Sequence, residues 1–130
     1  MRRVHLILGL LGVATFLITG QLMKHHNPPV RMLTPEVRMM YVSRHIYLLG
    51  AALVNLVLGL YLRDYSPGWR RALQRIGSVL IFLSVLSLLM AFISEPGLGL
   101  AGRSWRSYFG LIGLFAGVMT HLVAALTGEH

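Results

Sequence analysis

Four long apolar blocks, separated by short polar connections, dominate the pattern of hydrophobic and polar residues along the chain. Each block is close to the ~20 residues that an α-helix needs to cross roughly 30 Å of hydrocarbon. Lipid offers no hydrogen bonds to an open backbone, so helices are the expected form. The pattern therefore predicts an all-α fold, a single four-transmembrane-helix bundle with up-down-up-down topology over residues 1–130, with spans at approximately 4–23, 42–62, 76–94 and 107–126.

The first apolar block follows a Met-Arg-Arg start, which is also how a secretory signal peptide can begin. Its apolar stretch is longer than the roughly 7–15 residues of a signal sequence, and no clear small-x-small cleavage site follows it. We therefore expect an uncleaved first transmembrane helix.

The connections contain signals for where helices begin and end. The Asn-Pro-Pro sequence at 27–29 breaks a helix, because proline removes a backbone donor. Thr34 is a potential cap, Pro35 suits a first helical turn and Glu36 favours the positive end of the helix dipole. The second helix is thus expected to begin near Pro35, well before its apolar run. A turn is expected at 66–68, and the Glu-Pro-Gly sequence at 95–97 should end the third helix.

Composition supports a membrane protein and changes how the positive charge is interpreted. Hydrophobic residues make up 55% of the 130 residues and charged residues only 12%, whereas soluble domains carry about a quarter. The formal charge of +8 comes from basic residues that flank the apolar spans. Orientation rules and anionic lipid head groups explain it better than nucleic acid does. The absence of cysteine removes disulfides, thiolate metal sites and thiol nucleophiles.

Basic residues tie at six on each side of the predicted membrane, so the positive-inside rule does not decide the orientation by count. The N-terminal arginine pair and the dense second connection favour cytoplasmic termini. The side of the termini carries Arg2, Arg3, Arg63, Arg70, Arg71 and Arg75, and the other side carries Lys24, Arg31, Arg38, Arg44, Arg103 and Arg106.

Polar residues gather at one predicted end of the bundle. Arg44 and His45 abut the apolar run of the second helix, where ionisable side chains usually face a bundle interior. Alternatively, Arg44 reaches out to the head groups and His45 lies at the interface. Glu95 could pair with Arg44 or Arg106, and a structural clamp between helices is favoured over a functional site. The candidate polar cluster is Gln21, Arg44, His45, Glu95 and Arg106.

Histidines raise the hypothesis of a b-type haem. His5 in the first helix and His121 in the antiparallel fourth helix could reach the same level and act as axial ligands, and His45 is a separate candidate. The competing interpretation is that Thr120 and His121 make interhelical hydrogen bonds. The histidines at 25 and 26 have methionines nearby, a ligand set that suits Cu(I), but their spacing matches no strict motif.

Two further features concern helix packing. Asn55 lies near the centre of the second helix and needs a partner in lipid, with Ser84 and Ser87 of the third helix as candidates. A stripe of small residues in the fourth helix permits close contact, either within the bundle or in a dimer. The stripe consists of Gly110, Gly113 and Gly117.

Two short segments carry a resemblance. The Thr-Gly-Gln sequence at 19–21 and the Ser-Arg-His-Ile-Tyr sequence at 43–47 resemble small four-helix integral membrane proteins of bacteria to which no function is assigned. The resemblance covers the first two helices and implies an inner-membrane protein without a known activity. Four-helix b-type cytochromes are similar in size and helix count, but the histidines of this chain are not clearly paired within the spans.

No reaction class follows from the sequence. Its four acidic residues lie in connections, at span ends or near a terminus, and nucleophile-elbow, phosphate-loop and zinc motifs are lacking. We therefore expect a non-enzymatic accessory or oligomeric membrane component, with lipids and a second copy or a membrane complex as partners. The alternatives are a haem-binding electron-transfer protein, or a small transporter or channel with a water path past Asn55. An intramembrane function is expected between the second and fourth helices.

Overall fold

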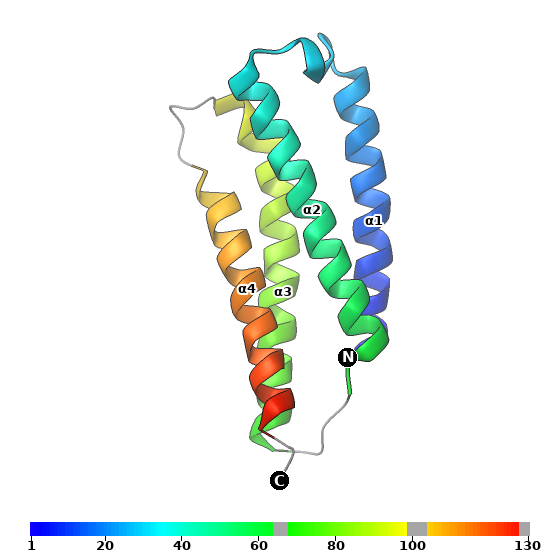
Figure 1. The fold of residues 1–130 in the computed structure, drawn as a ribbon, viewed down its shortest axis with the longest axis vertical. Coiled ribbons are helices and arrows are strands. Elements are labelled where there is room, and N and C mark those ends of the chain that lie inside the picture. The colour runs from blue at the N-terminus through cyan, green and yellow to red at the C-terminus, as the bar shows by residue number, and fades with distance from the viewer. Residues whose placement is uncertain (64–67, 99–103, 128–130) are drawn as a thin grey trace.

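The computed structural model describes residues 1–63, 68–98 and 104–127, and the prediction of a four-helix all-α fold is confirmed. All four α-helices are long and apolar enough to span a membrane. Successive helices run in opposite directions, as Figure 1 shows. The elements are α1 (Arg2–His25), the 3₁₀ turn η1 (Val30–Met32), α2 (Pro35–Tyr61), α3 (Trp69–Ser94), the 3₁₀ turn η2 (Pro96–Leu98) and α4 (Trp105–Leu126).

The helices extend beyond their apolar runs. α2 begins at Pro35, as predicted, with Glu36 in its first turn. Thr34 occupies the cap position without a side-chain capping bond, and its carbonyl accepts a hydrogen bond from the backbone N–H of Arg38 at 2.9 Å. α3 begins at Trp69 rather than near residue 76, because polar residues can continue a helix past the hydrocarbon region. Residues 66 and 67 of the expected turn lie outside the described part of the chain.

The bundle consists of two closely packed helical hairpins. α1 packs on α2, α3 packs on α4, and α2 joins the hairpins by contacting α3. The buried core lies at this central contact and consists of Leu48, Ala51, Leu88 and Phe92. Figure 1 shows α1 and α4 on opposite sides of the α2–α3 pair. The two hairpins therefore depend on one central contact, supplemented by polar links at its two ends.

Glycines allow the backbones within each hairpin to approach closely. On α4, a Cβ atom at Gly117 would lie 2.5 Å from Cγ1 of Ile81, so the helices leave no room for a side chain there. On α2, a Cβ atom at Gly59 would lie 2.6 Å from the Cα atom of Leu6 in α1. Small residues are the usual means of such contact in membranes. The predicted stripe of Gly110, Gly113 and Gly117 packs on α3 inside the bundle.

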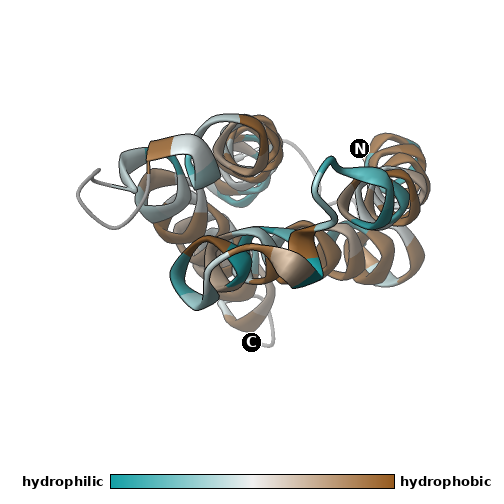
Figure 2. Cartoon of the chain, turned by 90° about the horizontal axis from the view of Figure 1, so that it is seen from above, coloured by the Kyte–Doolittle hydropathy of each residue, from teal (hydrophilic) through white to brown (hydrophobic). Residues whose placement is uncertain are grey.

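The outer faces of the helices are apolar. Figure 2 shows largely hydrophobic helices, with hydrophilic residues concentrated towards the connections. α1 is the least buried of the four spans. Of the residues in its apolar 18-residue stretch, 11% are buried, against 22% in α4 and 33% in α2 and α3. Since such a surface would be unfavourable in water, the arrangement supports an integral membrane location.

Candidate functional site

One end of the α2–α3 contact is linked by an ion pair. Nε of Arg44 donates to Oε2 of Glu95 at 2.9 Å, and both side chains are buried. The rest of the guanidinium is also engaged: Nη1 donates to Oγ of Ser43 at 2.9 Å, and Nη2 donates to Oγ of Ser104. We call this group, together with Ser107, the arginine cluster. It joins α2 to the end of α3 and the start of α4.

Glu95 also caps α4 from outside that helix. Its Oε1 accepts the backbone N–H of Ser107 at 3.0 Å, and its Oε2 accepts the Ser107 hydroxyl at 2.5 Å. The first N–H groups of a helix lack partners within the helix, and its N-terminus favours negative charge. Burial alone would raise the pKa of the Glu95 carboxyl, but hydrogen bonds from Ser107 and the Arg44 guanidinium outweigh it and lower the pKa. The carboxylate is thereby held ionised and saturated with donors.

The structure brings only part of the predicted polar cluster together. Gln21 is exposed, and Nη1 of Arg106 donates to Oγ of Ser94 at 2.8 Å instead of pairing with Glu95. His45 lies beside α1: its Nδ1 is 3.0 Å from Oγ1 of Thr19, and its ring stacks on Phe16 with centroids 4.0 Å apart. His45 therefore contacts α1, and its ring also lies 6.4 Å from that of Phe92 in α3, but it takes no part in the hydrogen bonds of the arginine cluster.

The opposite end of the bundle carries a second polar group that joins all four helices. Nδ1 of His5 lies 2.8 Å from Oδ1 of Asn55, and its Nε2 lies 2.8 Å from Oγ of Ser78. The same hydroxyl is 3.3 Å from Nε2 of His121. The two imidazole rings meet edge to face, with centroids 5.7 Å apart. We call His5, Asn55, Ser78 and His121 the histidine cluster.

The hydrogen bonds of this cluster fix the direction of each donor. Nδ2 of Asn55 donates to the carbonyl of Ala51 at 2.9 Å, so its Oδ1 faces His5 and must accept from Nδ1–H. In the neutral ring, Nε2 of His5 is then an acceptor, and Ser78 donates to it at 2.8 Å in preference to the Met1 sulfur at 3.8 Å, which is a weak acceptor. The hydroxyl of Ser78 accepts in turn from Nε2–H of His121. This assignment leaves Nδ1 of His121 as a bare acceptor, buried and without a partner.

Two expected partners are wrong. Asn55 bonds to His5 and not to the serines of α3, because the hydroxyl of Ser84 donates to Leu80 O and that of Ser87 to Arg106 O. Thr120 donates to the carbonyl of Gly117 in its own helix rather than to another helix. Of the two residues expected to bond between helices, His121 does so, through its contact with Ser78 of α3.

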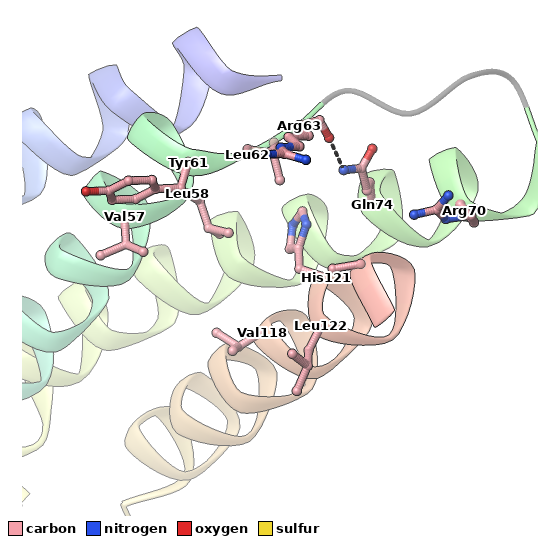
Figure 3. A pocket seen from close by; sticks show the side chains of 11 residues that line it. Val57, Leu58, Tyr61, Leu62, Arg63, Arg70, Gln74, Val118, His121 and Leu122 are labelled. Atoms are coloured by element: carbon pink, nitrogen blue, oxygen red, sulfur yellow. Dashed lines mark hydrogen bonds between the residues drawn. The ribbon is translucent and has the colours of Figure 1, made fainter. Parts of the chain in front are cut away.

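Beside His121 the bundle is open between α2 and α4. A groove of about 630 Å³ is lined by the end of α2, the start of α3 and the last turns of α4. Figure 3 shows His121 and Gln74 in this lining, with Nε2 of Gln74 donating to the carbonyl of Arg63 at 2.6 Å. Oε1 of Gln74 is buried without a partner. The groove lies between the two helices where an intramembrane function was expected.

The proposed haem ligands do not fit a haem. Both ring nitrogens of His5 hold hydrogen bonds of 2.8 Å, and the Nε2 atoms of His5 and His121 share one serine hydroxyl where an iron would have to lie. Nδ1 of His45 lies against Thr19. In residues 1–63, 68–98 and 104–127, no three His, Asp or Glu side chains are grouped to hold a metal ion. The histidines at 25 and 26 bond to backbone carbonyls near their own helix end.

A water path past Asn55 is also not favoured. The side chain of Asn55 is fully buried, and both ends of its amide are bonded.

Sequence reasoning missed Ser78 and Gln74. Ser78 completes the histidine cluster, and Gln74 lines the groove beside it. Neither carries a motif: small and amide side chains are ordinary in helices, and only the helix register brings them together.

Comparisons with known proteins add no relative. No family model, curated protein or solved structure matches the chain.

Proposed function

We propose that the chain is a non-enzymatic membrane protein that serves as a small accessory component, associating with a partner helix through the outer face of α1. The observation that carries the proposal is the exposure of α1. This helix is the least buried of the four, and it packs along α2, with His5 as its link to α3 and α4. Leu10 and Leu17 are 58% and 61% exposed on its free face.

The polar clusters support a scaffold role. In the arginine cluster, each nitrogen of the guanidinium and each oxygen of the carboxylate has a partner within the protein. Ion pairs of this kind are common structural alternatives to active sites. A pair of hairpins with α1 exposed on one flank is well suited to present that helix to a neighbour, because within lipid the packing of helices depends on shape rather than on apolar burial.

Photocrosslinking in native membranes tests this proposal. A photoreactive phenylalanine analogue is placed at Leu10 or Leu17 of α1, and at Phe115 of α4 as the control, which is 66% exposed. The proposal expects discrete protein adducts from both α1 positions and chiefly lipid adducts from Phe115. Tagging two differently sized copies shows whether the partner is a second copy. Lipid adducts alone from both α1 positions would contradict an accessory role through this face.

We further propose that the protein resides in a bacterial inner membrane with cytoplasmic termini. The support is the arginine pair at the start of the chain and the dense basic connection before α3. The chain has no cysteine, so single cysteines can be introduced without background. A membrane-impermeant thiol reagent should label Met32→Cys in intact cells and should label Arg71→Cys only after the membrane is opened. The reverse pattern would invert the orientation.

A further inference from the structure

Two residues that line the groove between α2 and α4 each have a buried polar atom without a partner. Nδ1 of His121 and Oε1 of Gln74 make no hydrogen bond in the described structure. The two residues are 7% and 1% exposed, and both line the groove. A buried polar atom without a hydrogen-bond partner is unfavourable in a low-dielectric interior. Both atoms therefore favour an occupant that supplies the missing bond.

Both atoms are acceptors, so the missing partner is a donor. Gln74 uses its amide N–H to reach the carbonyl of Arg63 at 2.6 Å, which leaves the oxygen as the unpaired end. His121 uses Nε2–H towards Ser78, which leaves Nδ1 with a lone pair. The second assignment follows from the amide of Asn55 through His5 and Ser78, so it does not depend on the groove.

The residues that line the groove indicate the charge and polarity of a molecule that would bind there. Val57, Leu58, Val118 and Leu122 give the groove apolar walls on α2 and α4. Arg63 and Arg70 also line it, and their charge disfavours a cationic head. An anionic head would set its own lone pairs against the two acceptors. Mostly apolar pockets of 300–1,000 Å³ with a few placed polar groups are typical of small-molecule sites, and this one has about 630 Å³.

We propose that the α2–α4 groove binds a lipid-soluble molecule with a neutral, hydroxyl-bearing head, which donates hydrogen bonds to His121 Nδ1 and Gln74 Oε1 while its apolar body lies along α2 and α4. A head with one hydroxyl satisfies one acceptor, and a head with two satisfies both. The site does not depend on a partner helix at α1, so it stands apart from the accessory role.

A matched pair of probes isolates the hydroxyl. 4-Octylphenol and its methyl ether share an apolar body, and only the phenol can donate a hydrogen bond. Each is titrated into the protein in lipid nanodiscs, and binding is followed by the methyl NMR signals of Val118 and Leu122. The phenol is expected to bind about tenfold more tightly, the effect of one hydrogen bond to a buried acceptor.

Variants then locate the preference. In the double variant Gln74→Leu with His121→Phe the phenol should lose its advantage over the ether. In His45→Phe, which removes a histidine at the other end of the bundle, the advantage should remain. The ratio of the two affinities is compared within each variant, so a change in groove shape affects both probes.

Three outcomes would overturn the proposal: equal affinities in the wild-type protein, a preference retained in the double variant, or no perturbation of either methyl group. Equal affinities would indicate that water satisfies the acceptors. If the double variant does not fold, the wild-type ratio still decides, supported by the side-chain ¹⁵N signal of His121 Nδ1, which should shift with the phenol and not with the ether.

Discussion

The two ends of this bundle differ in how their buried polar side chains find hydrogen-bond partners. The arginine cluster joins α2, α3 and α4 through an ion pair whose polar atoms all have partners, whereas the histidine cluster joins all four helices without an ion pair and leaves one acceptor unpaired. Glu95 accepts from Arg44 and twice from Ser107, so its carboxylate is saturated. The series of hydrogen bonds that runs from Asn55 through His5 and Ser78 to His121 ends at an acceptor without a partner, and His121 lines a groove. A closed cluster can act as a clamp, while an open one can also receive a ligand.

Removal of one charge of the Arg44–Glu95 pair should lower the free energy of unfolding more than any other change proposed here, because it leaves the other charge buried and unpaired. We expect Glu95→Leu to lower the free energy of unfolding by about 3–5 kcal/mol, measured by SDS titration in mixed micelles. The double variant Arg44→Met with Glu95→Leu should recover much of that loss, since a buried pair can often be replaced by apolar residues. A loss below about 1 kcal/mol in the single variant would show that the cluster is no clamp.

Low pH should selectively weaken the stabilisation that the arginine cluster provides. The folded-state pKa of Glu95 lies below its ordinary value of 4.5, so its stabilising contribution is complete above that value and is lost as the pH falls through the lower folded-state pKa. The melting temperature of wild type in detergent should therefore exceed that of Glu95→Gln at pH 7, and the difference should shrink in acid. A difference that stays constant down to pH 3 would contradict a depressed pKa.

Close packing beside the histidine cluster should be the next most sensitive feature. A Cβ atom at Gly77 would lie 2.9 Å from the carbonyl oxygen of Gly117 and 2.9 Å from Cδ2 of His121. We expect Gly77→Ala to lower the free energy of unfolding by about 1–3 kcal/mol, as overpacking does. Gly50, where a Cβ atom would meet nothing within 4 Å, is the matched control. Gly50→Ala should be neutral or slightly stabilising, and equal losses at both sites would refute the argument from packing.

The neutral hydrogen bonds themselves should contribute less than the ion pair. Asn55→Leu removes the acceptor of His5, and a single hydrogen bond between membrane helices is worth about 0.6–1.7 kcal/mol. We expect a loss in that range by SDS titration, clearly smaller than for Glu95→Leu. A loss as large as that of the charged residue would remove the distinction between the two ends.

The sequence predicts the spans and several levels within them, but not the faces of the helices. Length and apolarity gave four helices, and proline and threonine placed the start of α2. Antiparallel order put His5 near His121 and Glu95 near Arg44. The rotation of each helix could not be predicted, because the lipid and the core are both apolar and leave little contrast between faces. For that reason the sequence predicts the wrong partners for Asn55 and does not single out Ser78, Gln74 or Ser107.

The contrast between a closed and an open cluster depends on where the protons of two histidines lie. Side-chain ¹⁵N NMR of the histidine-labelled protein in nanodiscs at neutral pH, assigned with His5→Gln and His121→Gln, measures this directly. We expect His5 to carry its proton on Nδ1 and His121 to carry its proton on Nε2, with Nδ1 bare. A proton on Nδ1 of His121, in a neutral or doubly protonated ring, would contradict this expectation.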